Sequence, residues 1–467
     1  MTNPSSATPV PPAGGGGGCP MGSGSGAVPL SGPGFHTEPQ TLYRSMRRDH
    51  GPVVPVELPG GFPAWLVIGY RELHQVTSDG ELYPRDVSLW NQWENIPPDW
   101  PLLPMVGTPM PSIYFTAGAE HRRHVEMVVP ALEAADPFEI RQHCEQLADR
   151  LIDAVCSRGT ADLVAEFAEP LPVLVLARLV GFPDDEGADI AQVLKDLADG
   201  GPGAQKAHLR FGEHMHRLVA AKRAHPGDDV TSRMLAHPEP FTDEEYALDH
   251  RLVAAKRAHP GDDVTSRMLA HPEPFTDEEY ALDLMAITAA GHLTTADWIG
   301  NSTRLMLTED QFADALSGGR HSVAEAMNEV LWEDGPTQIL AGRWASRDAR
   351  LGGQNIARGD MLLLGLGAAN ADPHIRQQVT DQVVRSGQGG NSSHMAFSHG
   401  EYRCPFPAQE IAEIIARTGI EVLLDRLPDL ELAVPATELM RRPSAFLRGM
   451  TALPVRFTPV RTTGDAL

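Results

Sequence analysis

The stretch Ser393–Ala416, SHMAFSHGEYRCPFPAQEIAEIIA, places a cysteine directly before an apolar-periodic segment that is typical of an amphipathic helix. Cys404 precedes Pro407, and Phe397 and Gly400 lie upstream in the same segment. A cysteine just ahead of a helix amino terminus can present a thiolate, because the helix dipole and free backbone N–H groups stabilise negative charge on sulfur. Cys404 is therefore a candidate ligand for a soft metal, although a lone loop cysteine can equally be a small buried hydrophobe.

The composition around this stretch indicates a globular protein with a substantial core. The chain has 467 residues, of which 42% are hydrophobic and 21% charged. A formal charge of −24 excludes a general attraction to nucleic acid or to an anionic membrane. The four cysteines are too few and too scattered for a disulfide framework, so a reducing cytoplasm is the expected location. The sequence also lacks a long apolar run and a secretory signal pattern, so we expect no membrane anchor.

The amino-terminal residues differ in composition from the rest of the chain. Residues 1–36 are rich in glycine, proline and serine, and Gly14–Gly18 is pure glycine. Such a stretch cannot bury enough apolar surface to offset the entropy of ordering it. We therefore expect residues 1–36 to be a disordered tail, with Cys19 as an incidental thiol, and residues 37–467 to form a single domain.

An identical internal repeat interrupts that domain. Residues 216–249 recur without a change as residues 250–283. Two identical copies indicate a recent duplication, natural or engineered, because the repeats of a solenoid diverge and number at least about three. In each copy a threonine, Thr276 in the second, begins a capping box. A fused helix over roughly 242–258 is a further hypothesis, as an extra arm or as the element of a domain-swapped dimer; light scattering that found only monomer would remove the swap.

The hydrophobic periods predict a mainly α fold with small β-sheets, a large helical domain with a smaller β-rich region. Helical periods occur near 137–157, 161–180, 276–307, 322–333 and 407–418, and strand-like runs near 52–57, 64–68, 338–345 and 361–366.

The cysteine segment resembles the haem-binding loop of the cytochrome P450 family, in which Phe397, Gly400 and Cys404 match the pattern. The resemblance implies haem b as cofactor and Cys404 as the thiolate ligand of its iron. It also implies that Phe397, Gly400 and Tyr402 surround the cofactor. Three positions depart from the pattern: Ser398 stands for a glycine, Tyr402 for a basic residue that meets a haem propionate, and Phe406 for a second glycine.

The segment Ala290–Thr295, AGHLTT, is similar to the family's long central helix over the haem. The resemblance assigns catalytic positions to Gly291, Thr294 and Thr295, with Thr294 as the oxygen-binding threonine. Leu293 occupies the place of the acid that relays protons, and leucine carries no proton. Without the other motifs, this segment would read as a small-residue helix contact.

Other segments follow in the family's order over roughly residues 40–460. Glu329 and Trp332 stand where the family has the Glu-x-x-Arg ion pair. Arg343 and His121 are implied propionate contacts, with a solvated arginine and a surface histidine as the alternatives. Val125 occupies the place of an arginine that also binds a propionate.

The proline-rich stretch 86–115 would form the roof of the substrate pocket in such a fold. It carries several aromatic residues: Trp90, Trp93, Trp100 and Tyr114. An aromatic lining suits a bulky apolar substrate, and ordinary anchoring of the loop is the alternative.

The resemblance favours a soluble bacterial-type haem-thiolate monooxygenase. It implies electrons from a ferredoxin and a ferredoxin reductase, and oxidation of a small apolar molecule in secondary metabolism. Docking of an acidic ferredoxin needs a basic cluster, for which Arg122, Arg123 and Arg403 are candidates. The departures leave two alternatives: a haem protein without ordinary oxygenase activity (peroxide-dependent, isomerase, dehydratase or cyclase), or a degenerate binding or regulatory protein.

Overall fold

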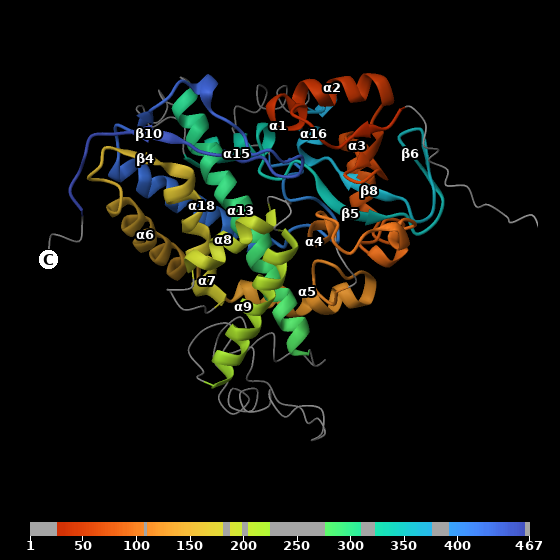
Figure 1. The fold of residues 1–467 in the computed structure, drawn as a ribbon, viewed down its shortest axis with the longest axis horizontal. Coiled ribbons are helices and arrows are strands. Elements are labelled where there is room, and N and C mark those ends of the chain that lie inside the picture. The colour runs from red at the N-terminus through yellow and green to blue at the C-terminus, as the bar shows by residue number, and fades with distance from the viewer. Residues whose placement is uncertain are drawn as a thin grey trace, which may run out of the picture.

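The computed structural model describes residues 26–106, 110–180, 187–198, 204–224, 276–309, 323–375 and 392–462. Figure 1 shows the long helix α13 crossing the molecule between a helix-rich part and a part built around the largest sheet. The mainly α fold with small sheets is therefore confirmed. The helices are α1 (Gly34–Thr37), α2 (Pro39–His50), α3 (Tyr70–Ser78), α4 (Leu103–Val106), α5 (Gly118–Glu133), α6 (Pro137–Asp153), α7 (Pro170–Val180), α8 (Gly187–Ala198), α9 (Ala204–Ala224), α13 (Asp277–Thr308), α15 (Val323–Glu333), α16 (Leu366–Asn370) and α18 (Phe406–Arg426), with short turns η1 (Val87–Leu89), η2 (Trp93–Asn95), η3 (Val164–Ala168) and η5 (Ala436–Glu438).

The strands form three small sheets. The largest has the order β1-β2-β3-β8-β5, the second β4-β10-β9, and the third β6-β7. In the largest, β3 and β8 run parallel, whereas β5 pairs antiparallel with β8 and its register shifts between Leu340 and Arg343. The strands are β1 (Val28–Pro29), β2 (Val53–Leu58), β3 (Phe62–Val67), β4 (Thr160–Asp162), β5 (Leu340–Trp344), β6 (Ala349–Leu351), β7 (Gln354–Ile356), β8 (Met361–Leu364), β9 (Glu431–Leu432) and β10 (Pro454–Arg456).

Most predicted elements are present near their predicted positions. The exception is the helix over 161–180, which is wrong in its first half. Residues 160–162 instead form β4, which pairs with β10, and a short π-helical turn, η3, follows. Pro170 then begins α7, as expected for a residue that fits the first turn of a helix better than its interior.

The expected disordered tail is too long at its carboxyl end. Val28 and Pro29 pair with β2, and the Leu30 amide donates to the Glu57 carbonyl at 2.7 Å. Leu30 and Phe35 are both buried in the core under the largest sheet. Composition missed this because the hydrogen-bond partners come from another strand. Residues 1–25, with Cys19, lie outside the described residues.

The two copies of the repeat meet the described fold only at their outer ends. The first copy enters as the end of α9, and the second leaves through the start of α13. The predicted capping box is confirmed at Thr276, whose hydroxyl accepts from the Glu279 amide at 3.2 Å while the Glu279 carboxylate accepts from the Thr276 amide at 2.6 Å. The proposed fused helix over 242–258 lies outside the described residues, so the domain swap stays a prediction.

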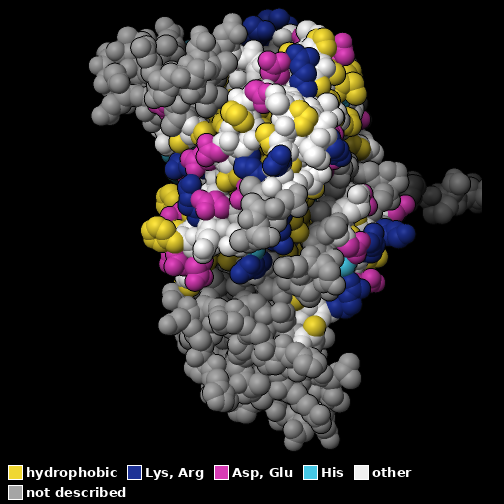
Figure 2. All heavy atoms as spheres, turned by 90° about the vertical axis from the view of Figure 1, so that its left-hand side faces the viewer, with side chains coloured by type: hydrophobic (Ala, Val, Ile, Leu, Met, Phe, Trp, Pro, Cys, Tyr) yellow, Lys and Arg dark blue, Asp and Glu magenta, His cyan; other side chains and the backbone are white. Residues whose placement is uncertain are grey.

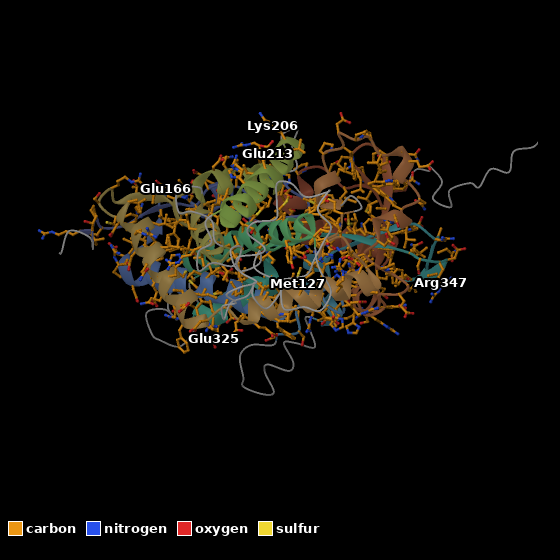
Figure 3. The ribbon with its side chains drawn as sticks, turned by 90° about the horizontal axis from the view of Figure 1, so that it is seen from below. Met127, Glu166, Lys206, Glu213, Glu325 and Arg347 are labelled. Carbon is orange, nitrogen blue, oxygen red and sulfur yellow. The ribbon has the colours of Figure 1, made fainter. Side chains whose placement is uncertain are left out.

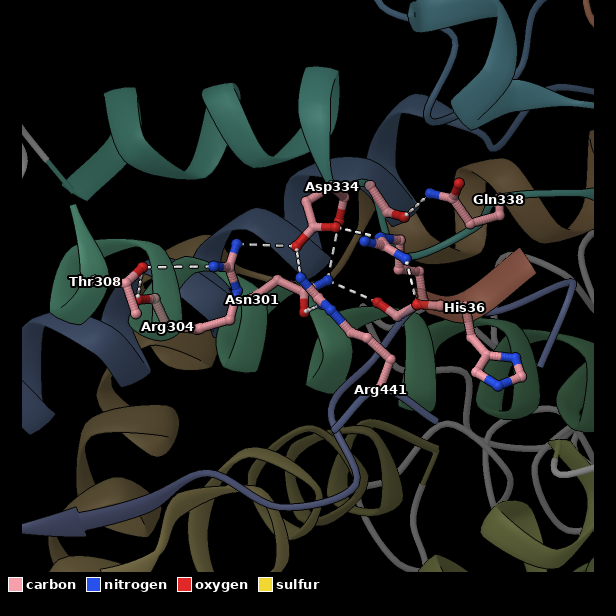
Figure 4. A network of polar contacts seen from close by, with 9 residues as sticks. His36, Asn301, Arg304, Thr308, Asp334, Gln338 and Arg441 are labelled. Atoms are coloured by element: carbon pink, nitrogen blue, oxygen red, sulfur yellow. Dashed lines mark hydrogen bonds and ion pairs between the residues drawn. The ribbon is translucent and has the colours of Figure 1, made fainter. Parts of the chain in front are cut away.

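A buried carboxylate, Asp334, ties the end of α15 to the rest of the helical part (Figure 4). It forms ion pairs with Arg304 on α13, at 3.1 Å, and with Arg441 and Arg448 of the carboxyl-terminal segment. Burial alone would raise the pKa of Asp334, but the three arginines lower it to about 2. This network lies one turn beyond the altered Glu-x-x-Arg positions.

The two residues at the altered Glu-x-x-Arg positions, Glu329 and Trp332, have different surroundings. Trp332 is buried and meets the His394 ring edge-on, with ring centroids 5.8 Å apart. Glu329 is half-buried and lines a recess that also holds Arg304, Arg441 and Arg448. Trp332 cannot form the ion pair of the Glu-x-x-Arg motif, and Glu329 shares its recess with arginines from other elements.

On the face in Figure 2, basic, acidic and apolar side chains are interspersed over the coloured atoms. Among the described residues, we find no helix with the length and apolarity needed to cross a bilayer.

Candidate active site

A cavity of about 920 Å³ lies between the helical part and the sheet part. Its walls come from α5, α13, the loop 110–115 and the segment 396–408. In the view of Figure 3, α5, marked by Met127, lies near the centre of the molecule. The lining is mainly apolar, as in pockets that bind small molecules, and the volume is at the upper end of the ordinary range of about 300–1,000 Å³.

Cys404 lines this cavity from the segment that precedes α18. Its amide donates to the Phe397 carbonyl at 3.0 Å, and the Gln409 side chain donates to its carbonyl at 2.6 Å, so the backbone on both sides of the sulfur is held. Burial raises the pKa of the Cys404 thiol to about 12, while the charge of Arg403 opposes that rise. A metal must therefore displace the thiol proton when it binds.

The cysteine segment has two left-handed residues. Gly400 has φ +74°, which glycine adopts without strain. Ser398, where the family has glycine, has φ +61° and is the one non-glycine residue with positive φ in the described chain. A serine here carries strain that a glycine avoids.

Three predicted cofactor residues lie together, and two of them, His121 and Tyr402, line the cavity. The His121 ring lies 4.6 Å from the Tyr402 ring, centroid to centroid, and the Cζ of Arg343 lies 4.5 Å from the centroid of Tyr402. One ring nitrogen of His121, Nδ1, lies 3.1 Å from the Ile113 carbonyl oxygen. Burial lowers the pKa of His121 to about 4, with the charges of Arg85 and Arg343 contributing, so the ring is neutral near pH 7. The alternatives of a surface histidine and a solvated arginine are wrong, because both residues are buried.

Arg85 joins this cluster, although no motif pointed to it. It lies between α3 and η1, lines the cavity, and is 6% exposed, while Arg343 is fully buried. In the described part of the chain neither guanidinium forms an ion pair, and Nη2 of both lacks a hydrogen-bond partner. The sequence carried one signal for it: Arg85 is the sole basic residue between His74 and His121.

The predicted catalytic residues line the same cavity from α13. Gly291, Thr294 and Thr295 are all in its wall. The Thr294 hydroxyl donates to the Ala290 carbonyl at 2.6 Å, so it is bonded to the backbone of its own helix one turn earlier. Leu293 is buried and also lines the cavity, so an apolar side chain occupies the position of the proton-relaying acid.

The aromatic residues predicted to form the roof of the pocket have two different roles. Tyr114 lines the cavity, with the Arg85 Cζ 3.6 Å from its ring centroid. Trp90 and Trp100 pack against each other at 5.8 Å in the core beneath the largest sheet, and Trp93 packs on Trp90 at 6.5 Å. Loop anchoring is therefore the better interpretation of the three tryptophans.

One of the three arginines expected in a docking cluster is internal. The Arg123 guanidinium bonds to Glu120 at 3.0 Å and to Glu279, at the start of α13. Its side chain is mostly buried, so it ties α5 to α13 and cannot meet a partner. Arg122 and Arg403 are exposed.

No family model matches the chain, but individual proteins do. It is 26% identical over 435 residues to the polyketide biosynthesis cytochrome P450 PksS of Bacillus subtilis, covering 90% of this chain and 96% of that protein. It is 27% identical over 435 residues to the cytochrome P450 monooxygenase PikC of Streptomyces venezuelae, covering 92% and 94%. The solved structure of CYP154C4 from a Streptomyces species superposes with a TM-score of 0.76 at 25% identity, covering 92% and 98%. The chain has the cytochrome P450 fold, and these relatives and structural neighbours are bacterial cytochrome P450s.

Like these relatives, the protein is an oxidoreductase whose cofactor is haem, and the site fits that group. Haem is a flat apolar ring with two carboxylates. The cavity offers apolar walls and the buried guanidinium of Arg85, and the buried Arg343 lies behind Tyr402 of the same wall. Cys404 would supply the sulfur donor, and Arg343 and His121 would be available to the carboxylates. Haem supplies the one-electron and oxygen chemistry, and the protein supplies the ligand, the pocket and proton delivery.

Proposed function

We propose that this P450 is a monooxygenase that takes electrons from a ferredoxin-type partner and oxidises a bulky apolar molecule of secondary metabolism. The observation that carries the proposal is that Cys404 shares one apolar cavity with Gly291, Thr294 and Thr295 of α13. The walls available to a substrate are apolar, with Met110, Phe115 and Met285 among them. The polyketide-biosynthesis role in the name of PksS supports the substrate class.

In this proposal Cys404 is the iron ligand, and His121 and Arg343 bind the propionates. Phe397, Gly400 and Tyr402 shape the cofactor's surroundings. The Phe397 ring packs edge-on against Trp298 of α13, with centroids 5.8 Å apart, and so connects the cysteine segment to the central helix. Thr294 and Thr295 are the hydroxyls available for proton delivery to the substrate side.

The decisive experiment is the carbon monoxide difference spectrum of the reduced protein. The wild type is expected to give the band of a haem thiolate, and Cys404→Ser is expected to lose it. Cys156→Ser is the matched control, because Cys156 is buried outside this cavity and should leave the band unchanged. Protein that stayed colourless after reconstitution with haemin would overturn the proposal.

Leu293 favours a second candidate function, a haem enzyme driven by peroxide. An apolar residue in the place of the acid removes a proton donor beside Thr294, whereas peroxide brings its own protons and electrons. The two candidates are separated by turnover of a fluorogenic apolar ether. Turnover with a ferredoxin and its reductase supports the first, and turnover with peroxide alone supports the second.

The electron donor is proposed to dock beside the cysteine segment. Arg403 is exposed, and its Cζ lies 3.8 Å from the ring centroid of Phe406, which is 62% exposed. Arg122 is close by, since both it and Arg403 neighbour Glu401, with Arg122 Nη1 3.5 Å from the Glu401 carboxylate. Arg403→Glu should slow reduction by an acidic ferredoxin and flatten its salt dependence, whereas Arg347→Glu should change neither.

A further inference from the structure

Arg85 is a buried cation that forms no ion pair with the residues the structure describes. Its Cζ lies 3.6 Å from the ring centroid of Tyr114, and it lines the same cavity as Cys404. The aromatic face attracts the guanidinium, but it does not satisfy the N–H donors. Nη2 of Arg85 has no hydrogen-bond partner among the described residues. A buried charge in this condition is costly unless an anion meets it.

The strand β5 is shaped to admit this side chain. Gly342 has φ +97°, at the register shift between Leu340 and Arg343. A Cβ on Gly342 would lie 3.4 Å from the Trp344 ring and 3.6 Å from Nε of Arg85. A larger residue would therefore extend into the space that Arg85 uses, and its backbone would be strained.

The same irregularity brings a second cation beside the first. Arg343 lies over Tyr402, and the hydroxyl of Tyr402 hydrogen-bonds to the backbone of Arg85. Burial lowers the pKa of Arg343 to about 9, and the charge of Arg85 adds to this effect. Two like charges in a buried site repel, so the arrangement suits a ligand with two negative groups.

The family's second propionate-binding arginine would stand at Val125 on α5. His121 and Val125 are one helical turn apart, and both line the cavity. Val125 has no donor to offer there, and Arg85 brings a guanidinium to the same end of the cavity from a different element.

We propose that Arg85 binds a haem propionate and so replaces the arginine that is absent at Val125. The inference rests on the proposed function, because it requires haem with Cys404 as its ligand. A carboxylate of a substrate would present the same chemistry to Arg85, so the test must distinguish the two sources.

The test follows haem transfer from purified holoprotein to excess apomyoglobin by Soret absorbance. Charge-assisted hydrogen bonds contribute about 1.5–3 kcal/mol, so Arg85→Met should release haem about tenfold to a hundredfold faster than the wild type. Arg85→Lys should release it at an intermediate rate, because lysine lacks the bidentate fork. Arg347→Met is the matched control; Arg347 is exposed at the periphery of the molecule (Figure 3) and should leave the rate unchanged.

Two further arms identify the partner group. Adding Val125→Arg to Arg85→Met should slow haem loss again, because it returns a guanidinium to the α5 position. With haem dimethyl ester, which lacks both carboxylates, the wild type and Arg85→Met should release the cofactor at rates within about twofold of each other. This arm separates propionate binding from a general loosening of the pocket.

The outcomes distinguish a failure of the role of Arg85 from a failure of the proposed function. A wild type that holds no haem defeats the proposed function. A wild type that holds haem, with Arg85→Met releasing it at the same rate, overturns the role of Arg85 alone, and this is the result expected if Arg85 serves a substrate carboxylate. A rate difference that persists with the dimethyl ester also overturns it. If Arg85→Met does not fold, Arg85→Lys is compared with both cofactors under the same criteria.

Discussion

A Cβ placed on Gly400 would lie 1.8 Å from the carbonyl oxygen of Thr77, far inside van der Waals contact. Thr77 belongs to the last turn of α3, and Gly400 lies four residues before Cys404. The approach is between two backbones, so rotation of a side chain cannot relieve a clash. The height of the cysteine segment over the cavity is therefore set by α3, a helix more than three hundred residues away in the chain.

Gly400→Ala is expected to destabilise the protein by about 2–5 kcal/mol and to lower its haem content. The cost combines a left-handed φ, about 1–2 kcal/mol, with overpacking, about 1–3 kcal/mol. Denaturant unfolding and the Soret absorbance per protein measure the two effects. Gly353→Ala is the control, because Gly353 has φ +87° with open space around its Cβ position. Equal losses for the two variants would contradict the steric argument.

Ser398→Gly is expected to stabilise the protein by about 1 kcal/mol. The substitution relieves a non-glycine residue at φ +61°. The Ser398 hydroxyl is also buried with no partner among the described residues. Ser398→Ala separates the two contributions, because it removes the hydroxyl and keeps the strain. A lower denaturant midpoint for the glycine variant would show that no strain is stored there.

Asp334→Asn is expected to lower the free energy of unfolding by about 3–5 kcal/mol at pH 7, because three arginines would then face an amide in a buried site. With a folded pKa of about 2 and an unfolded value of 3.8, the ionised Asp334 stabilises the fold above about pH 4. That contribution declines as the pH falls toward 2, so the difference between Asp334→Asn and the wild type should shrink.

Chemical unfolding of both proteins at pH 7, 4 and 2.5 measures this trend. Glu431→Gln is the control, because the Glu431 ion pair with Arg456, at 2.8 Å, is largely exposed and should contribute less than about 1 kcal/mol. A loss for Asp334→Asn as small as that of the control at pH 7 would refute the anchoring role.

Leu293→Asp is expected to raise the yield of product per electron consumed by about tenfold or more. A carboxylate beside Thr294 adds a proton donor, and positioned acids and bases typically contribute 10²–10⁴-fold. The assay compares reductant consumed, peroxide released and fluorescent product from an apolar ether. Leu293→Asn matches the shape without the titrating proton and should leave the yield at the wild-type level. A yield that rose equally in both variants would rule out proton delivery.

Local pattern predicted most of the elements and the residues of the candidate site. Residues 276–307 carry their own capping box and helical period, and the observed α13 spans Asp277–Thr308. The positions of Cys404, Gly400 and Thr294 were predicted from the order of short motifs, and the structure brings all three to one cavity. These predictions succeed because capping, periodicity and motif spacing depend on residues within a few positions of each other.

Other features were wrong or missed because their partners lie far away in the chain. Residues 28–35 read as a disordered tail until β2 supplies hydrogen bonds to β1. Arg123 reads as a surface charge until Glu279 of α13 meets it.

The sequence by itself therefore determined most of the helices, the candidate sulfur ligand and the resemblance to the cytochrome P450 family, since each depends on nearby residues. Only the tertiary structure decided which charges are buried. It buries Arg85 near Arg343 and leaves Arg85 in the wall of the cavity, a result of packing between segments more than 250 positions apart. Whether a charged side chain is buried changes its free energy far more than which charged residue it is. Burial depends on how the whole chain packs, so a local sequence pattern does not reveal it.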